Sequence, residues 1–249
     1  MGKFLAKTCL VLILSLLINY ARAFAMPAFQ AYIDGASAGT LGQDENTWFS
    51  NNNPFNLFVV GAYGENTIGL SEIILIISVP QGERGTISFA TSDETPSLLT
   101  ILASPEPKIN AEADILTDYP GNDGYFTKDV LHAVFSEHYP FDDAVSDFLV
   151  YGLQDFDNSE NTLKDYNAAD GSISSTQASG EQKEYEVSFS GFSKLHFDVY
   201  GRIREENGFR WEINPNNYDS AVFGATPEPA TLALFGLGLL GMGALRKKE

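Results

Sequence analysis

The sequence predicts an all-β protein: a single antiparallel β-sandwich of the jelly-roll or immunoglobulin-like type, with an N-terminal signal peptide and a C-terminal membrane-spanning helix. Short runs rich in Val, Ile, Phe and Tyr recur between clusters of Gly, Asn, Asp and Pro, which is typical of strands joined by turns. In residues 185–189 and 195–199 every second residue is apolar, which is the period of a strand with one buried face. No long stretch has the period of a helix.

Eight segments satisfy this strand pattern, and seven or eight short strands with turns between them indicate a sandwich. They are residues 55–63, 70–79, 86–90, 98–103, 130–137, 147–153, 185–190 and 194–200. Three polar segments are predicted to be loops: 35–53, 105–123 and 155–184. The last of these is so long that it is either functional or tethered.

The composition excludes some functions. The chain has 249 residues, a formal net charge of −18 and a single cysteine, Cys9. Such an acidic surface repels nucleic acid and anionic lipid. One cysteine cannot form an intrachain disulfide, so stability has to come from core burial or from bound ions.

The N-terminus has the three parts of a secretory signal. Lys3 and Lys7 precede an apolar stretch at residues 9–18. Small residues follow, and we expect signal peptidase to cleave after Ala25, with Ala23 and Ala25 in the small-x-small site. Cleavage two residues earlier also fits the rule, and an uncleaved anchor is the alternative. Residues 1–25 are therefore the predicted signal peptide.

The C-terminus begins with a stiff tripeptide. Pro227 and Pro229 each fix a backbone dihedral and remove an amide donor, so the chain is extended around Glu228. A processing enzyme could read this shape outside the membrane; a plain linker is the alternative.

An apolar run and a basic end follow the tripeptide. Residues 231–245 carry no charge and would span roughly 22 Å as a helix, against a bilayer core of about 30 Å. A buried core helix is the alternative for so short a run. The basic cluster Arg246, Lys247 and Lys248 favours a weak membrane span with this end in the cytoplasm.

Residues 226–249, with the motif at 227–229, the apolar span at 231–245 and the basic end at 246–248, resemble a PEP-CTERM sorting signal. Thr226 stands where many members have Val. The resemblance implies recognition by an exosortase-type transpeptidase, cleavage near the motif and transfer to the cell surface. It also implies a host that makes exopolysaccharide.

The predicted exported domain, residues 26–225, has a resemblance of its own. Tyr139-Pro140, Tyr166-Asn167-Ala168 with Asp170-Gly171, and Gly191-Phe192 followed by 195–201 resemble choice-of-anchor domains of type N. The resemblance implies a surface domain and supplies no catalytic residue.

The predicted loop at 155–184 begins with a stretch dense in Asp, Asn and Glu, residues 155–170, which we call the acidic segment. A calcium site is one interpretation of this segment, because Ca²⁺ takes six to eight oxygen ligands. The spacing does not fit an EF-hand, and a solvated loop with Asx turns is the alternative. The candidate ligands are Asp155, Asp157, Asn158, Glu160, Asp165, Asn167 and Asp170.

Other chemistry has weaker support. Trp48 and Trp211, each near asparagines, could stack on a sugar, although ordinary packing in a sandwich core beside a turn is the more common explanation. The three histidines, His132, His138 and His196, are interpreted as structural, with His196 facing solvent or the acidic segment. No nucleophile motif or nucleotide-binding fingerprint occurs, and no acid pair stands out as that of a glycosidase.

We therefore expect a non-enzymatic exported protein of the cell surface or extracellular matrix, held first at the inner membrane by its C-terminal helix. A carbohydrate-binding module for exopolysaccharide is the first alternative, and a glycoside hydrolase with two carboxylates is the second. No nucleic-acid partner is expected.

Overall fold

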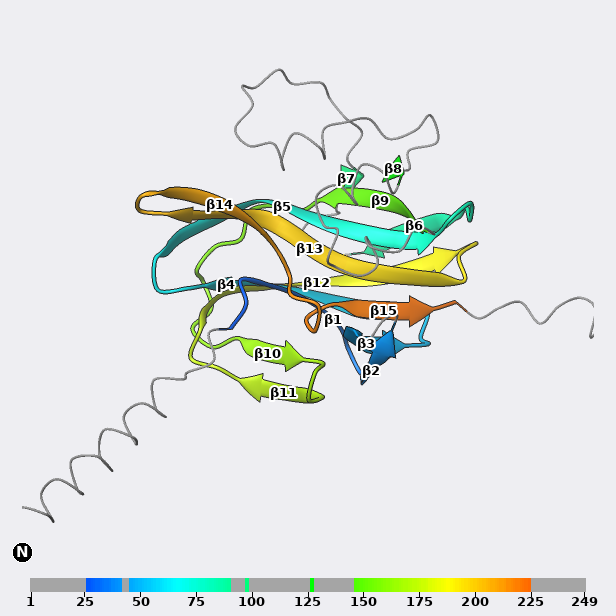
Figure 1. The fold of residues 1–249 in the computed structure, drawn as a ribbon, viewed down its shortest axis with the longest axis horizontal. Coiled ribbons are helices and arrows are strands. Elements are labelled where there is room, and N and C mark those ends of the chain that lie inside the picture. Colours follow the sequence, from blue (N-terminus) through cyan, green and yellow to red (C-terminus); the bar gives the residue numbers. More distant parts are fainter. Residues whose placement is uncertain (1–25, 42–44, 91–96, 99–125, 128–145, 225–249) are drawn as a thin grey trace, which may run out of the picture.

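A computed structural model describes residues 26–41, 45–90, 97–98, 126–127 and 146–224. These residues form fifteen β-strands and no helix (Figure 1). The strands are β1 (Phe29–Ile33), β2 (Ser37–Leu41), β3 (Glu45–Ser50), β4 (Phe55–Tyr63), β5 (Thr67–Pro80), β6 (Thr86–Ala90), β7 (Ser97–Leu98), β8 (Phe126–Thr127), β9 (Ser146–Gly152), β10 (Lys164–Asn167), β11 (Ser172–Ser175), β12 (Ser179–Ser190), β13 (Lys194–Glu205), β14 (Gly208–Ile213) and β15 (Ser220–Phe223).

The strands form two main sheets and a separate hairpin. The four-stranded sheet has the order β1-β4-β12-β6. The nine-stranded sheet follows the path β2-β3-β15-β13-β5-β9-β7, with β14 paired to β13 and β8 paired to β9. Strands β10 and β11 pair only with each other. The result is sandwich-like: β4 and β12 of the smaller sheet lie against β5 and β13 of the larger one (Figure 1).

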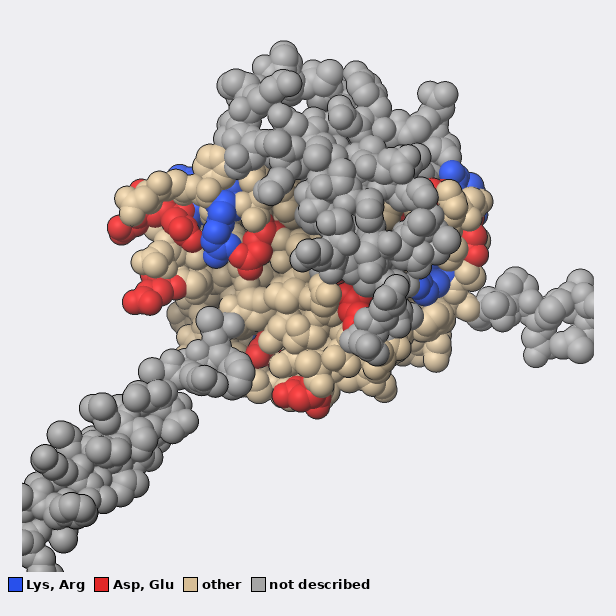
Figure 2. All heavy atoms as spheres, viewed as in Figure 1, with Lys and Arg blue, Asp and Glu red and all other residues tan. Residues whose placement is uncertain are grey.

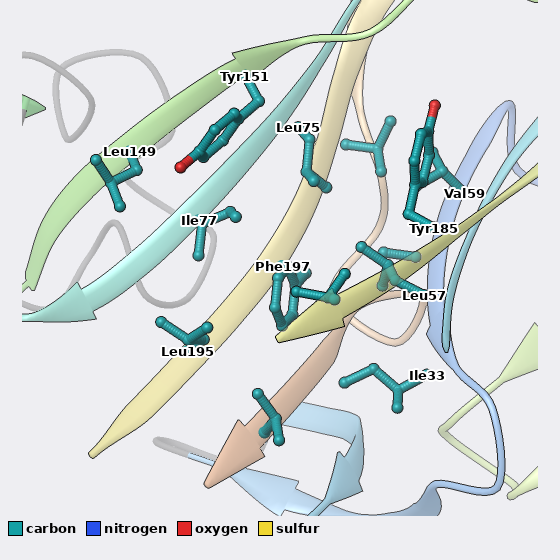
Figure 3. Close-up of a cluster of buried hydrophobic side chains, with 14 of the residues drawn as sticks. Ile33, Leu57, Val59, Leu75, Ile77, Leu149, Tyr151, Tyr185, Leu195 and Phe197 are labelled. Atoms are coloured by element: carbon teal, nitrogen blue, oxygen red, sulfur yellow. The ribbon is translucent and has the colours of Figure 1, made fainter. Parts of the chain in front are cut away.

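The main core lies between the two sheets. Apolar side chains from alternate positions of facing strands meet there, as Leu57 and Val59 of β4 do with Leu75 and Ile77 of β5 (Figure 3). All four of these side chains are fully buried. The alternation that predicted the strands is therefore the alternation that fills the core.

Most of the predicted strands that lie in the described residues are confirmed. Strands β4 and β6 have the predicted bounds, β5 and β9 differ by a few residues at their ends, and β12 and β13 extend beyond the predicted segments. The predicted strand at 98–103 overlaps only the short β7, and the rest of it lies outside the described residues.

The prediction of a purely antiparallel sandwich was wrong in one pairing. Strand β15 pairs with β3 in parallel, with Ser220 opposite Trp48. Parallel neighbours need a long crossover connection, and most of the chain lies between these two strands. Short turns, on which the prediction rested, carry no information about such a pairing.

Two predicted loops contain strands. Residues 35–53 include β2 and β3, and residues 155–184 include β10, β11 and the start of β12. Strands β1, β14 and β15 were also not predicted. Strand β11 has the sequence Ser-Ile-Ser-Ser and is exposed throughout, so it lacks the apolar alternation that marks a half-buried strand.

The long acidic segment is tethered by an aromatic anchor. Tyr166 of β10 is 1% exposed and stacks on Tyr32 with ring centroids 4.1 Å apart. Its backbone amide donates to Gln30 Oε1 at 2.8 Å, and its hydroxyl donates to Gln182 Oε1 at 2.9 Å. A second buried cluster, with Tyr166, Tyr32 and Trp48 among its members, thus fixes the β10–β11 hairpin to strands β1, β3 and β4.

Several predictions fall outside the described residues. These are the signal peptide at 1–25, the predicted loop at 105–123, the predicted strand at 130–137, His132 and His138, and the C-terminal segment from residue 225 onward. Within the part of the chain that the structure does describe, no helix is long and apolar enough to cross a membrane.

Candidate functional site

Three neighbouring strands of the nine-stranded sheet bring a group of ionisable side chains together. Glu45 opens β3, Asp219 immediately precedes β15, and His196 and Asp198 lie on β13. Because β3, β15 and β13 are adjacent in the sheet, side chains on the same face of these strands converge. We call Glu45, His196, Asp198 and Asp219 the buried polar cluster.

The cluster is sealed from solvent. Glu45 is 6% exposed, and the other three residues are 0% exposed. His196 Nδ1 lies 3.0 Å from Asp198 Oδ2, and His196 Nε2 lies 3.6 Å from Asp219 Oδ2. One ligand atom each from Glu45, His196 and Asp219 can be chosen so that all three lie within 4.8 Å of one another.

Hydrogen bonds from neighbouring residues orient the carboxylates. Thr47 Oγ1 donates to Asp219 Oδ1. Asn214 Nδ2 donates to Asp198 Oδ1 at 3.4 Å, while Asn214 Oδ1 accepts the Val199 amide at 2.6 Å. A carboxylate only accepts hydrogen bonds, so the bond to Asp198 places a proton on His196 Nδ1 and directs Nε2 toward Asp219.

The electrostatics of the cluster follow from burial among carboxylates. Burial lowers the pKa of His196, but the charges of Asp198 and Asp219 outweigh it and raise that pKa to about 10. Burial, with a further contribution from Asp219, raises the pKa of Glu45 to about 10. Without a bound ion, His196 is therefore an imidazolium and Glu45 a neutral acid at pH 7.

The prediction that His196 faces solvent or the acidic segment was wrong. The alternation in 195–199 correctly places His196 and Asp198 on the face opposite Leu195 and Phe197. That second face is also buried at this position, since both polar side chains are 0% exposed. Alternation assigns a residue to a face of the sheet, and it does not reveal what covers that face.

Sequence reasoning missed the cluster as a site. A local signal was present, because the two-residue spacing of His196 and Asp198 puts both side chains on one face of a strand. Glu45 and Asp219 gave no such signal, since only the parallel pairing of β3 with β15 brings them to β13.

The seven candidate calcium ligands are distributed over several elements. Asp155, Asp157, Asn158 and Glu160 precede β10; Asp165 and Asn167 lie on β10, and Asp170 lies in the β10–β11 turn. Among the described residues, Glu45, His196 and Asp219 form a group of three acidic or histidine side chains that lie close enough to share an ion. The acidic segment does not form one.

Three side-chain oxygens of that segment accept hydrogen bonds from backbone amides. Asp155 Oδ1 accepts the Glu72 amide at 2.9 Å. Asn167 Oδ1 accepts the Ala169 amide, and Asp170 Oδ1 accepts the Ser172 amide, which are Asx turns. Figure 2 shows acidic and basic side chains in several separate groups on the described part of the face in view, with uncharged surface between them.

The two tryptophans differ in accessibility. Trp48 is 3% exposed, packs edge-on against Tyr32 and donates from Nε1 to the Tyr166 carbonyl at 3.1 Å. This corrects its assignment as a sugar-stacking residue, because no ring face is open. Trp211 of β14 is half-buried and stacks on Tyr200, with ring centroids 5.1 Å apart.

Comparison with known protein families identifies the C-terminal segment. Residues 225–248 match the PEP-CTERM protein-sorting motif. The chain carries a sorting signal. The match contains Pro227, Glu228, Pro229 and the basic end at 246–248, and it confirms the predicted resemblance of this segment to a PEP-CTERM sorting signal.

A PEP-CTERM motif indicates an exported protein that is sorted to the surface or a membrane through its C-terminus, and such signals are processed by exosortase. No curated protein matches the chain. The resemblance of residues 138–201 to choice-of-anchor domains has no support in these comparisons and stays a prediction.

Proposed function

We propose that this chain is a non-enzymatic protein of the cell surface or extracellular matrix, delivered as a folded β-sandwich and processed through its PEP-CTERM signal. The match of residues 225–248 to the sorting motif carries the proposal. In it, signal peptidase removes residues 1–25, residues 231–245 hold the chain in the inner membrane, and an exosortase-type transpeptidase acts at residues 227–229.

The fold is consistent with a protein that works outside the cell. A large buried core lies between the sheets, so the domain has a source of stability that does not depend on disulfides. In the sequence Glu228 stands between two prolines, whose fixed dihedrals are expected to favour an extended segment that a processing enzyme could read.

The sorting proposal is tested by expressing the full chain in a host that encodes an exosortase. Glu228→Ala is expected to accumulate a longer, membrane-bound form, visible as a mobility difference after fractionation. Glu249→Ala is the matched control, since it removes a carboxylate just outside the matched segment. Unchanged size and location in the Glu228→Ala protein would contradict the proposal.

The basic end is tested separately. Replacing Arg246, Lys247 and Lys248 by Gln removes the charges that keep this end in the cytoplasm. We expect weaker retention of the unprocessed chain in the membrane fraction. Full retention would show that the apolar run alone is sufficient.

Exopolysaccharide binding is a second candidate, supported by the aromatic side chains of β14. Phe209 and Trp211 are two residues apart and therefore share a face of the strand. Phe209 is 38% exposed, and the Arg202 guanidinium lies 5.3 Å from its ring centroid. Arg202 also pairs with Glu72 Oε1 at 2.6 Å, so the support for sugar binding comes from the partly exposed aromatic side chains of this strand.

A glycan array tests this second candidate. Saturable binding by the full chain that is lost in Trp211→Ala would support it. Phe223→Ala is the control, because Phe223 is a 36% exposed aromatic side chain on another strand, stacked on Phe49. Equal loss in both variants would indicate nonspecific adhesion.

A further inference from the structure

The three inward-facing groups Glu45, His196 and Asp219 have the donor set of a transition-metal site. Each can offer one atom, and these atoms lie within 4.8 Å of one another. In a tetrahedral zinc site with bonds of about 2.0–2.2 Å, ligand atoms are roughly 3.4 Å apart. His196 Nε2 and Asp219 Oδ2, at 3.6 Å, already have this separation. A Glu45 oxygen, within 4.8 Å of both atoms, has to move closer to complete three ligands.

The second observation concerns Glu45. Both of its carboxylate oxygens are buried and make no hydrogen bond of good geometry with the described residues. Burial raises the pKa of Glu45, and the polar group that acts on its oxygens is another carboxylate, that of Asp219, whose charge and side-chain interaction raise that pKa further. A buried acid in this condition is costly unless something satisfies it. Its position beside two other potential ligands means that one cation would satisfy all three at once.

The surroundings of His196 are those of a metal-bound imidazole. Metal-ligating histidines usually donate the other ring nitrogen to a carboxylate or carbonyl, which fixes the tautomer and the ring orientation. His196 has this arrangement, with Nδ1 bonded to Asp198 at 3.0 Å and Asp198 held in turn by Asn214. Nε2 is thereby directed to the point where Asp219 and Glu45 meet.

We propose that Glu45, His196 and Asp219 bind one divalent transition-metal ion of the zinc class, with Asp198 as the residue that positions His196. Imidazole with carboxylate suits zinc and its neighbours. Calcium fits poorly, because it takes six to eight oxygens at longer distances, and one of the three donors here is nitrogen. The proposal concerns the sandwich itself and does not depend on the sorting proposal.

The ion would have a structural role. The three ligands come from β3, β13 and the residue before β15, which are far apart in the sequence and adjacent in the sheet. A metal that joins them stabilises the folded state because the site does not exist in the unfolded chain.

The first test measures binding to the full-length chain in detergent. After treatment with a chelator, we expect zinc titration to give one ion per chain by calorimetry and a higher melting temperature. Millimolar calcium should not displace the zinc. If zinc gives neither a binding heat nor a higher melting temperature, the proposal is overturned. The cluster is then a network of ion pairs and hydrogen bonds that binds no metal.

Variants locate the site. Glu45→Gln keeps the volume of the side chain and removes a ligand charge, so the metal-free protein should fold and its zinc affinity should fall at least tenfold. Asp147→Asn is the control: Asp147 is another buried acid of the same sheet, 8% exposed and 2.7 Å from Arg84. Wild-type affinity in Glu45→Gln would show that zinc binds elsewhere and would overturn the assignment.

The role of Asp198 has its own readout. Asp198→Asn should lower zinc affinity by roughly 10–100-fold while the stoichiometry stays at one. The visible spectrum of the cobalt-substituted protein should change, because the imidazole donor is altered. An unchanged affinity and spectrum would show that Asp198 does not position the ligand.

Discussion

Two acidic regions of this protein differ in how their carboxylates are used. The acidic segment, residues 155–170, is dense in Asp, Asn and Glu along the sequence, yet these side chains lie on several elements and mostly face solvent. The buried polar cluster takes its four residues from three distant stretches and brings them within hydrogen-bond or ligand distance. Carboxylates that are dense in sequence need not converge in space.

The difference has a physical origin. Exposed Asp and Asn side chains in a turn find nearby backbone amides, as Asp170 does with Ser172, and water satisfies the rest. Buried carboxylates have no water, so each needs a donor, a cation or a proton. Ion binding is therefore expected where charges are forced together by the fold, and is less expected where they are merely numerous.

Removing the central cation of the buried polar cluster should have the largest effect. His196→Ala leaves Asp198 and Asp219 buried without the imidazolium between them, and we expect a loss of about 3–5 kcal/mol in the free energy of unfolding. Urea denaturation in the presence of a chelator measures this without any contribution from metal. A loss close to zero would show that water reaches the cluster.

The sequence predicted the strands of the main core well, because Leu75, Ile77, Val187 and Phe197 follow a period of two and fill one space. It could not predict β11, whose exposed serines have no apolar face. Apolar period is a signal of burial, and an exposed strand held by pairing alone lacks it.

The candidate site was less accessible to sequence reasoning than the fold. His196 and Asp198 could be assigned to one face, but their burial depends on what packs there. Glu45 and Asp219 join them only through the parallel pairing of β3 and β15, and no local pattern encodes such a pairing. The C-terminal signal was predictable because its motif, apolar run and basic end are contiguous.

The next largest effect concerns the anchor of the acidic segment. Tyr166→Phe removes the hydroxyl that donates to Gln182, and we expect a loss of about 1 kcal/mol in the free energy of unfolding. Tyr63→Phe is the matched control, since its hydroxyl donates to the Phe156 carbonyl at 2.9 Å outside the hairpin. Hydrogen exchange should speed up across β10 and β11 in the first variant and not in the second.

Calcium should affect the protein only weakly. One oxygen each of Asp155, Asn167 and Asp170 already accepts a backbone amide, and the acidic side chains of the segment do not form a group close enough to share an ion. We expect the melting temperature in calcium to equal that in magnesium at the same concentration. A saturable calorimetric signal for calcium that is lost in Asp165→Asn would show that the acidic segment does bind an ion. The two regions would then not differ in ion binding as we expect.

A single charge removed in each region by the same chemistry compares the two regions directly, and the smaller effect is expected in the exposed one. In Asp170→Asn the new amide oxygen can still accept the Ser172 amide, so the urea midpoint should not change measurably. In Asp219→Asn one carboxamide oxygen can still accept from Thr47, but the charge that faces His196 is gone. This second midpoint should fall, because a buried imidazolium then has only Asp198 to balance it. Equal urea midpoints for the two variants would mean that the stability of the protein depends no more on a charge in the buried polar cluster than on one in an exposed turn.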